Sequence, residues 1–331
     1  MKALVYTRPN EIVLREEADP VPGPGEALIR IEAVGICGSD MHGYHGHDSR
    51  RVPPLILGHE AAGIVTGGTG PGRRVVINPL IPCGRCEDCL TGRTNICAGR
   101  RFISMHRPGA FAELIAMPET NLIDTPREMS PVAAALTEPA ATALHALHLV
   151  QQVSPRPLSE FRVLVIGGGS IGLLSALWLR NFGCRDVTLA ETNALRRASA
   201  ARSGACAVHD PQAGPALPEN HYHLVVDAVG AAATRAAAIR AARPGGVIVH
   251  IGLLQGNGDA DFRKLTLSEI TFIGTYTYTH LDMQATVAAL AAGKLGDLAW
   301  VETRPLADGS RAFDDLDKGR SAAAKIVLLP V

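Results

Sequence analysis

Short runs rich in apolar residues recur in the first third of the chain. The runs are bounded by Gly and Pro, as strands joined by tight loops are. They cover residues 2–6, 26–36, 60–68 and 73–80. This pattern predicts a β-rich domain that resembles a small irregular barrel more than a helical bundle.

The pattern changes near residue 161, where FRVLVIGGG forms a continuous apolar run. Such a run is expected of a strand buried on both faces. Helical spacing follows and stops at Gly183. Further strand candidates alternate with Ala-rich helical stretches such as 194–204; they cover residues 186–191, 206–210, 223–230, 245–253 and 270–277. About six strands in this βαβ rhythm predict an α/β fold with a parallel, doubly wound sheet.

The end of the chain is too short to form a domain. It shows one helical pattern, over residues 285–293, and one closing strand, over residues 324–330. We therefore expect it to pack back on the first domain. The predicted division is a β-rich domain over 1–145, a parallel-sheet domain over 146–280 and a returning segment over 281–331.

Composition narrows the classes of function. The 331 residues carry 32 Lys and Arg against 32 Asp and Glu, and only 4% are aromatic. Neither a basic field nor base-stacking platforms are expected, so nucleic acid is not a predicted partner. The most apolar long stretch, 131–150, is broken by Glu138, Pro139 and two His, and the N-terminus shows no secretory signal. A cytoplasmic enzyme without a membrane partner is the expectation.

A glycine-rich loop stands between the first strand and the first helix of the parallel-sheet domain. Gly167, Gly169 and Gly172 form GxGxxG, with Ser170 and Ile171 opening the helix. The first Gly allows a tight turn, the second lets the backbone approach a pyrophosphate, and the third lets helix and strand pack closely. The free N–H groups of the helix then face the phosphates. The loop predicts a dinucleotide site.

An acidic residue about 20 positions later is the next sign of such a site. Glu191 follows Gly172 by 19 residues and ends a predicted strand. A carboxylate there accepts hydrogen bonds from ribose hydroxyls and repels a 2′-phosphate, which favours NAD over NADP. Arg196 or Arg197 could instead pair with a 2′-phosphate, and Glu191 could be a solvated strand end.

Four of the seven cysteines lie together in the stretch 80–100. Their spacing is C-x2-C-x2-C-x7-C. Four thiolates from one short loop can close a tetrahedron around zinc and leave no open position, so a structural zinc is predicted; iron–sulfur ligation uses similar ligands. The residues are Cys83, Cys86, Cys89 and Cys97.

A second, looser set of metal-ligating residue types is spread over GICGSDMH, GHE and TEP. Singly each is weak, because a lone His is usually a core or surface residue and Cys37 could be a small buried hydrophobe. Together Cys37, His59, Glu60 and Glu138 could give zinc three protein ligands and one open position. Zinc there would lower the pKa of a bound alcohol and favour loss of a hydride.

The order of these motifs resembles that of the zinc-containing medium-chain dehydrogenase family, along nearly the whole chain. Glu138 stands at the third ligand position, where alcohol dehydrogenases carry a Cys, and this substitution resembles the sorbitol, iditol and threonine dehydrogenase branch. The resemblance implies a GroES-like catalytic domain, a Rossmann NAD-binding domain and a homodimer or homotetramer joined near residues 270–277.

The resemblance also implies individual roles. Cys37 and His59 would ligate the catalytic zinc, and either Glu60 or Glu138 would complete it, directly or through water. Asp40 would orient His59. Ser39 and His42 would pass the alcohol proton to solvent, although Ser39 could be a turn residue and His42 a surface His. His45 and His47 are expected to be exposed or next to the substrate, not ligands.

The implied substrate is a polyol, a sugar acid or an amino alcohol. In residues 272–280, Thr277 stands where sorbitol dehydrogenases carry a polyol-binding Arg, and the stretch before Arg73 is shorter than usual. Threonine 3-dehydrogenase and a general secondary alcohol dehydrogenase remain alternatives. A zinc-independent reductase would lack the four cysteines, and a zinc-ribbon module would carry a basic patch instead of CEDC.

Overall fold

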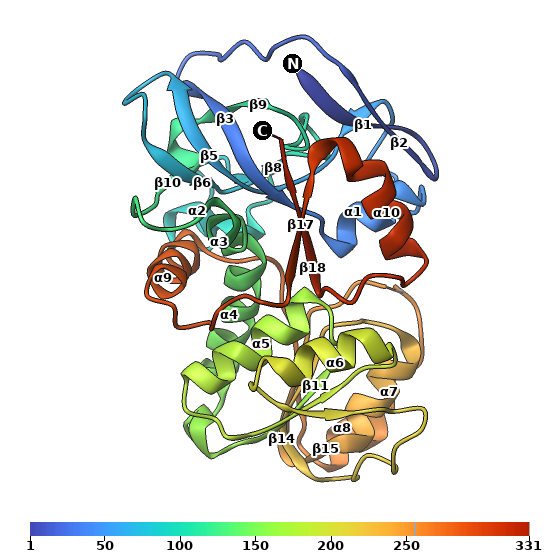
Figure 1. Ribbon diagram of the computed structural model, residues 1–331. Coiled ribbons are helices and arrows are strands. Elements are labelled where there is room, and N and C mark those ends of the chain that lie inside the picture. Colours follow the sequence, from blue (N-terminus) through green and yellow to red (C-terminus); the bar gives the residue numbers. More distant parts are fainter. Residues whose placement is uncertain (255, 331) are drawn as a thin grey trace.

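The computed structural model describes residues 1–254 and 256–330. In this part of the chain a β-rich lobe lies above an α/β lobe, and both chain ends lie on the β-rich lobe (Figure 1). The two lobes differ in the sequence patterns from which their strands and helices form. The predicted α/β class, with a β-rich N-terminal part and a parallel-sheet part, is confirmed.

Over the described residues, the β-rich lobe contains three sheets, of three, seven and two strands. In β3 the residues alternate between buried and half-buried positions, which is the pattern of a strand with one face on the core. The sheets have the orders β2-β1-β4, β10-β6-β5-β3-β18-β17 with β9 added to β3, and β7-β8. Their bounds are β1 Lys2–Arg8, β2 Glu11–Glu16, β3 Glu26–Gly35, β4 Leu55–Ile56, β5 Glu60–Gly67, β6 Arg74–Ile77, β7 Leu80–Ile81, β8 Arg101–Phe102, β9 Leu114–Pro118, β10 Leu122–Asp124, β17 Val301–Pro305 and β18 Lys325–Leu329.

Helices on this lobe are short. They are α1 Gly38–Tyr44, α2 Glu87–Leu90, α3 Pro131–Ala135 and α10 Gly309–Asp317, with 3-10 turns η1 Thr94–Ile96, η2 Glu119–Asn121 and η4 Leu306–Asp308. A core of fully buried side chains, such as Leu4, Ile29 and Phe111, fills the space between the sheets, and Phe313 of α10 belongs to the same core.

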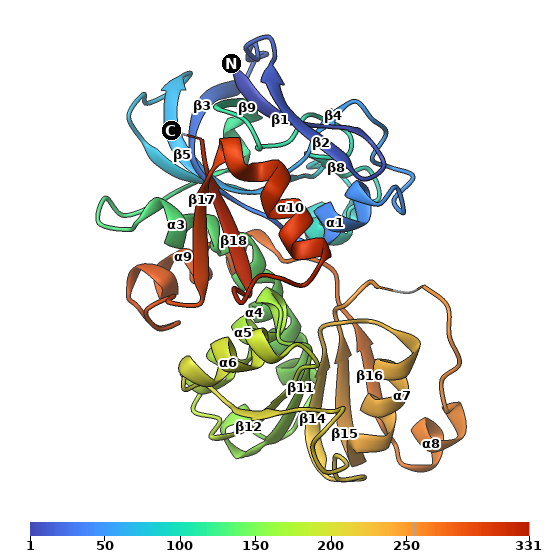
Figure 2. The same ribbon diagram turned by 45° about the vertical axis from the view of Figure 1, so that its right-hand side comes forward.

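The α/β lobe is built on one parallel sheet with the order β13-β12-β11-β14-β15-β16. Every strand pair in it is parallel, as predicted. Helices α5 and α6 lie toward one side of the sheet and α7 and α8 toward the other (Figure 2). The elements are β11 Arg162–Ile166, α5 Ser170–Asn181, β12 Asp186–Ala190, α6 Ala194–Arg202, β13 Ala207–His209, β14 Tyr222–Asp227, α7 Ala232–Ala241, β15 Ala242–His250, α8 Phe262–Leu267 and β16 Thr271–Gly274, with η3 Leu158–Glu160 before β11.

Helix α4, Thr137–Val153, runs between the two lobes and packs against α5 and against α9, His280–Ala291 (Figure 1). Its residues Ala140, Leu144 and Leu147 are buried in a core shared with the parallel sheet. The predicted domain limit at 145/146 therefore falls inside a helix. The stretch carries no Gly that would end it, so the sequence offers no local sign of where one lobe passes into the other.

The end of the chain holds more elements than the one helix and one strand that the sequence indicated. Besides α9 and β18 it contains β17 and α10. β17 is polar at most positions, and α10 has only Ala312, Phe313 and Leu316 as an apolar stripe. Both patterns are too short for periodicity to reveal. β18 pairs with β3 and with β17, which places this segment on the β-rich lobe.

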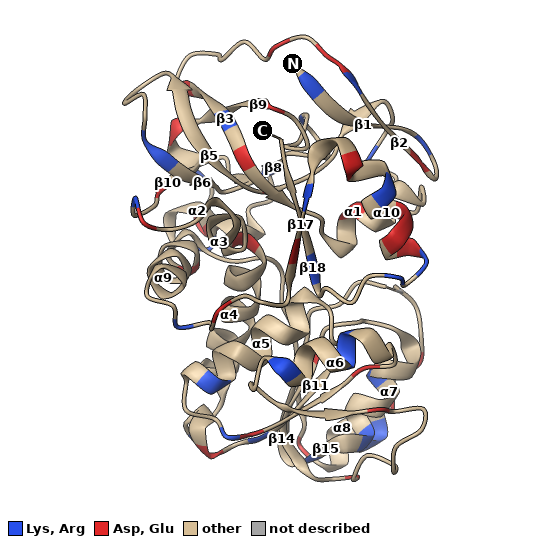
Figure 3. Ribbon diagram, viewed as in Figure 1, with Lys and Arg blue, Asp and Glu red and all other residues tan. Residues whose placement is uncertain are grey.

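Lys and Arg residues are mixed with Asp and Glu over both lobes, and the view in Figure 3 shows no face of one sign. Among the helices of the described residues, none has the length and apolar character that a membrane crossing needs.

Candidate active site

Strand pairing in the β-rich lobe brings three metal-ligating side chains together. Cys37 precedes α1 directly, and His59 and Glu60 lie where β5 begins. β3 and β5 are antiparallel and place Gly35 opposite Glu60. The ligand atoms of Cys37, His59 and Glu60 lie within 4.8 Å of one another. A Cβ on Gly35 would lie 2.1 Å from a Glu60 carboxylate oxygen, so only glycine leaves room for that carboxylate.

The imidazole of His59 is held in one orientation. Its Nδ1 lies 3.4 Å from Asp40 Oδ1 and 3.5 Å from Ser104 Oγ, and the ring of Phe102 packs edge-on at 5.2 Å. Burial by itself would lower the pKa of His59, but the Asp40 carboxylate raises it well above the ordinary value. With Nδ1 turned to Asp40, the Nε2 atom remains for a metal or for Ser39, whose Oγ lies 3.5 Å away.

Besides lying next to Cys37 and His59, the Glu60 carboxylate is paired with Lys325, a partner that the sequence did not reveal. Lys325 Nζ lies 2.6 Å from both carboxylate oxygens and donates to the Ile36 carbonyl at 2.8 Å. Both side chains are buried, at 1% and 0% exposure. Burial alone would lower the pKa of Lys325, but Glu60 raises it above its ordinary value. An ammonium and a metal ion would therefore share one carboxylate.

Glu138, at the start of α4, lies close to these residues without belonging to the group of three. Tyr278 donates a hydrogen bond of 2.8 Å to its carboxylate, and both side chains are buried. Burial raises the pKa of Glu138 to about 7, and the nearby Glu60 carboxylate adds to the rise while His59 opposes it. The loop that follows β16 thus reaches the metal-ligating residues through Tyr278.

The residues of the expected proton relay lie on α1. His42 is half-buried, and burial, followed by the nearby His47 and His45, lowers its pKa. Arg51 is 3% exposed and donates to Ser39 Oγ at 3.3 Å. Nothing in the sequence singled out Arg51, because an Arg in a polar loop ordinarily lies in solvent.

The remaining histidines of this loop do not join the group of metal-ligating residues. His45 Nε2 lies 2.7 Å from Asp317, which follows from the packing of α10 beside α1. His47 is exposed, and its ring lies 5.5 Å from that of His45.

The four cysteines of the stretch 80–100 form a second group, on a separate loop. Their sulfur atoms lie within 4.8 Å of one another. Backbone N–H groups of Arg85 and Cys86 lower the pKa of the Cys83 thiol to about 6, whereas burial raises the pKa of the Cys89 thiol to about 12. α2 buries no residue, so its own short helix adds little apolar packing to the loop. The group is Cys83, Cys86, Cys89 and Cys97.

The glycine-rich loop lies between β11 and α5, as predicted. Gly167 has φ +101°, a conformation that favours glycine, and a Cβ on Gly172 would lie 1.8 Å from the Gly167 carbonyl oxygen. Gly169 caps α5 and has open space beside it, and Ser170 and Ile171 form the first turn. Open space therefore lies beside Gly169 at the N-terminus of α5, which suits a pyrophosphate.

Glu191 ends β12 next to this loop. Its carboxylate accepts hydrogen bonds from Gly168 N and from Asn193 N, both at 2.7 Å. Arg197 donates to the carbonyls of residues 191 and 192 and not to this carboxylate. Arg196 Nε is buried and has no hydrogen-bond partner among the described residues.

Known proteins share this arrangement. Residues 23–127 match the family profile described as "Alcohol dehydrogenase GroES-like domain", and residues 170–292 match "Zinc-binding dehydrogenase". L-galactonate-5-dehydrogenase of Escherichia coli K12 is 31% identical over 335 residues, which cover 95% of this chain and 94% of that protein. The chain belongs to the zinc-type medium-chain dehydrogenase family. It is therefore an oxidoreductase, as the order of its motifs predicted.

Other members of the family differ in substrate and cofactor. L-threonine 3-dehydrogenase of Pyrococcus horikoshii is 32% identical over 298 residues, with 85% of this chain and 84% of that protein covered. A dehydrogenase structure from Sinorhizobium meliloti 1021, solved with NADP, is 31% identical with a TM-score of 0.88 and covers 99% of both chains. These relatives establish the family of this chain but do not establish its substrate.

One buried polar network of this dehydrogenase was missed by sequence reasoning. Asp282 accepts hydrogen bonds from His145 at 2.8 Å and His148 at 2.7 Å, which joins α9 to α4. Asn95, on the four-cysteine loop, donates to the Tyr276 carbonyl at 3.0 Å and lies 3.3 Å from His145. The four-cysteine loop is thereby fastened to the segment that carries Tyr278. Residues so far apart in sequence give no local sign of this contact.

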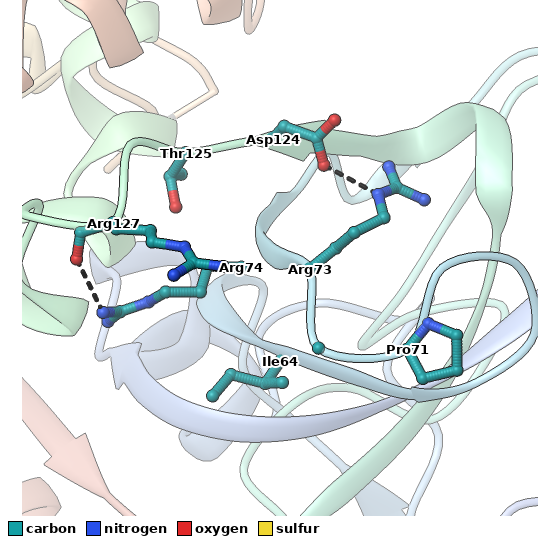
Figure 4. Close-up of a pocket in the computed structure, with 8 residues that line it drawn as sticks. Ile64, Pro71, Arg73, Arg74, Asp124, Thr125 and Arg127 are labelled. Carbon is teal, nitrogen blue, oxygen red and sulfur yellow. Dashed lines mark hydrogen bonds and ion pairs between the residues drawn. The ribbon is translucent and has the colours of Figure 1, made fainter.

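The hollows on the surface lie elsewhere. The one in Figure 4, of about 700 Å³, is lined by none of the predicted site residues; Arg73 donates to Asp124 there, and Arg74 to the Arg127 carbonyl. A second hollow of about 480 Å³ lies between β10 and α9. Neither hollow is lined by Cys37, His59 or Glu60, the three residues whose metal-ligating atoms lie together.

Proposed function

We propose that this dehydrogenase oxidises a secondary alcohol of a polyol or sugar-derived alcohol to a ketone and transfers the hydride to NAD. The alcohol carbon loses a hydride, the nicotinamide gains it, and the hydroxyl proton leaves to solvent. The observation that carries the proposal is the group Cys37, His59 and Glu60, with donor atoms within 4.8 Å.

A thiolate, an imidazole and a carboxylate are a donor set that suits a catalytic zinc. Zinc held there would polarise the alcohol and lower its pKa. Asp40 keeps His59 turned so that Nε2 faces the site. Glu60 is favoured over Glu138 as the third zinc ligand, because Glu138 accepts a hydrogen bond from Tyr278 and lies outside the group of three.

Ser39 and His42 are proposed to carry the proton outward. Arg51 donates to Ser39 Oγ, so the hydroxyl keeps its own proton for another acceptor. His42 is half-buried and its pKa is lowered, chiefly by burial, so it is available as a proton acceptor at neutral pH.

NAD is proposed over NADP. Ser170, Ile171 and the three glycines would bind the pyrophosphate, and Glu191 would accept from the ribose hydroxyls. Two backbone N–H groups fix its carboxylate where a 2′-phosphate would be repelled. Arg196 is proposed to line the adenosine end. The S. meliloti relative was solved with NADP, so the preference needs a direct test.

The domain division, the compartment and the assembly are part of the same proposal. We keep a catalytic domain over 1–145, a cofactor domain over 146–280 and a returning segment over 281–331. None of the seven cysteines is in a disulfide, which suits a reducing compartment, and we propose the cytoplasm. A homodimer or homotetramer joined through the β16 edge is expected, and the four cysteines are proposed to bind a structural zinc.

The test is the rate of nicotinamide reduction over a panel of polyols, sugar acids, threonine and simple secondary alcohols. Each is run with NAD and NADP, before and after chelation. NAD-preferring, chelator-sensitive oxidation of a hydroxylated sugar derivative is expected, and Glu191→Ala should raise the relative rate with NADP.

Turnover of threonine alone would make the protein an L-threonine 3-dehydrogenase, and turnover of simple alcohols alone a general secondary alcohol dehydrogenase. Cys37→Ala removes one donor atom of the group and tests the role of the group directly. Activity that survives in this variant would refute the role of the group.

A further inference from the structure

The segment between β16 and α9 holds a backbone conformation that it would not keep by itself. Thr277, between Tyr276 and Tyr278, has φ +49°, in the left-handed region that a β-branched residue strongly disfavours. Its hydroxyl oxygen is buried and has no hydrogen-bond partner among the described residues. Such a backbone persists only where the surrounding structure determines it, so contacts on both sides of Thr277 must hold it.

On the C-terminal side of Thr277 the contacts are with α4 and α9. Tyr278 is 1% exposed and donates to the Glu138 carboxylate at 2.8 Å. Thr279 caps α9 and donates to Asp282 through its backbone N–H at 2.8 Å and its hydroxyl at 2.7 Å. This side of the segment is therefore fixed next to the metal-ligating residues.

On the N-terminal side the contacts come from the four-cysteine loop. Asn95 is 4% exposed, and its Nδ2 donates to the Tyr276 carbonyl at 3.0 Å. The guanidinium of Arg100, at the end of the same loop, lies over the Tyr276 ring with 4.8 Å to the ring centroid. The loop thus holds Tyr276 by its backbone and by its ring, directly before the strained residue.

Both of these groups depend on Cys97. Asn95 lies two positions before it, in η1, and the Cys97 carbonyl accepts a hydrogen bond from Arg100 at 2.9 Å. Cys97 is fully buried, and its sulfur belongs to the group of four that can hold a metal ion. A metal bound there would therefore fix the two side chains that hold Tyr276.

We propose that Asn95 is a positioning residue of the active site, through which metal binding by the four cysteines orders the segment 275–279. When the cysteines hold a metal, the Asn95 amide keeps the Tyr276 carbonyl in place. Loss of that metal releases Tyr276, Thr277 then leaves its left-handed conformation, and Tyr278 no longer has a fixed place beside the active site. The turnover part of the test rests on the proposed function, and the exchange part does not.

Hydrogen exchange of the peptide that spans 275–279 measures the link without any substrate. In Asn95→Ala this peptide should exchange about five- to tenfold faster, as the loss of one buried hydrogen bond implies, while metal analysis finds an unchanged zinc content. Cys97→Ser should also speed the exchange, through loss of the metal. The double variant should exchange no faster than Cys97→Ser alone, because both changes release the same contact.

Turnover separates a positioning role from a merely structural one. Asn95→Ala should raise KM for the alcohol about five- to tenfold and leave KM for NAD unchanged, because the glycine-rich loop is not part of the link. A merely structural loss would lower the fraction of active protein, and so kcat alone. Arg100→Gln, which removes only the cation over the Tyr276 ring, should give about two- to fivefold changes of the same kind and carries the test where Asn95→Ala does not fold.

Asn121→Ala is the matched control. Asn121 is also a buried asparagine, and its Nδ2 donates to the carbonyls of Asn78 and Leu80 at 2.8 Å. Its loss should lower stability and leave the exchange of 275–279 and KM for the alcohol at their wild-type values.

Three results would overturn the proposal. The first is wild-type exchange of 275–279 in Asn95→Ala, and the second is a loss of zinc in that variant, because the amide would then act on the metal site itself. The third is a double variant whose exchange rises by both single effects together, since the two residues would then act independently. A wild-type protein that oxidises no alcohol would overturn the proposed function and leave the exchange result standing.

Discussion

Lys325 and Glu60 form a fully buried ion pair at the centre of the candidate active site. Two buried charges lose much hydration, and only close contact with each other and with further polar groups compensates for the loss. Here Lys325 also donates to the Ile36 carbonyl, so the ammonium is well satisfied. Removing one partner leaves the other charged and without water.

We therefore expect Lys325→Met to lower the free energy of unfolding of the metal-free protein by about 3–5 kcal/mol. Urea unfolding after chelation measures it. Adding Glu60→Gln to Lys325→Met should recover a large part of the loss, because the stranded carboxylate is then neutral. Lys318→Met, which breaks an exposed ion pair with Asp314, is the control and should change stability little. Equal losses in the single and the double variant would contradict the prediction.

The Lys325–Glu60 pair also shows what could not be predicted from the sequence. The closing strand over 324–330 was predicted from its apolar run, and β18 confirms it. The sequence gives no sign of a role for Lys325, the first residue of β18, because its partner Glu60 is 265 positions away. Cys37, His59 and Glu60 could be proposed because their side chains can ligate zinc and their order resembles a known family, whereas Lys325, Arg51 and Tyr278 acquire their surroundings only through the fold.

At the scale of elements, one carboxylate joins α4 to α9. Asp282 accepts from His145, His148 and Thr279, and its side chain is 5% exposed. Burial alone would raise the pKa of Asp282, but these hydrogen bonds hold it well below the ordinary value. The ionised form therefore stabilises the folded state.

Asp282→Asn should lower the free energy of unfolding by about 2–3 kcal/mol at neutral pH. The gap between wild type and variant should shrink as the pH falls below about 4, because the unfolded chain then takes up a proton that the folded carboxylate refuses. Denaturant titrations at several pH values measure it. Asp259→Asn, at an exposed position, is the control. A gap that stays constant down to the acid limit of folding would contradict the role of charge.

The four-cysteine loop is the second element whose stability can be tested apart from activity. α2 buries nothing, and Cys97 and Asn95 are the buried residues of this segment. Metal ligation would therefore supply most of its stability. Cys97→Ser should contain about one zinc fewer per chain by metal analysis, and Arg85 and Arg93 should become faster sites of tryptic cleavage. Cys206→Ser lies outside both groups and should keep its zinc; an unchanged zinc content in Cys97→Ser would refute the site.

Prediction of elements succeeded where a pattern was long or continuous. The central strands β11 and β14 stood out because nearly all their residues are buried and their apolar runs are unbroken, whereas β13 and β16 at the sheet edges are largely exposed or half-buried. β17 and α10 were missed because five polar-rich residues and a three-residue apolar stripe carry no usable period. Their places are set by β18 and by the core around Phe313, which only tertiary packing creates.

At the scale of the whole molecule, the parallel sheet ends in a strand that nothing in the described chain covers. β16 pairs with β15 on one side only and stands last in the order of the sheet. Phe272 on this strand is 41% exposed. A free edge with an exposed aromatic invites pairing with another chain, and a second copy related by a twofold axis would continue the sheet.

Phe272→Lys should therefore shift the protein from a dimer or tetramer toward a monomer, because two lysines would meet across the twofold axis without water to separate them. Sedimentation velocity at assay concentration measures the mass. Leu195→Lys, at an exposed leucine of α6 away from this edge in the sheet order, is the matched control and should leave the assembly intact. A wild-type protein that sediments as a monomer would remove the assembly from the proposal, and a Phe272→Lys variant that keeps the wild-type mass would move the interface to another surface. In either case the active site, which one chain builds from its own residues, would stay as described.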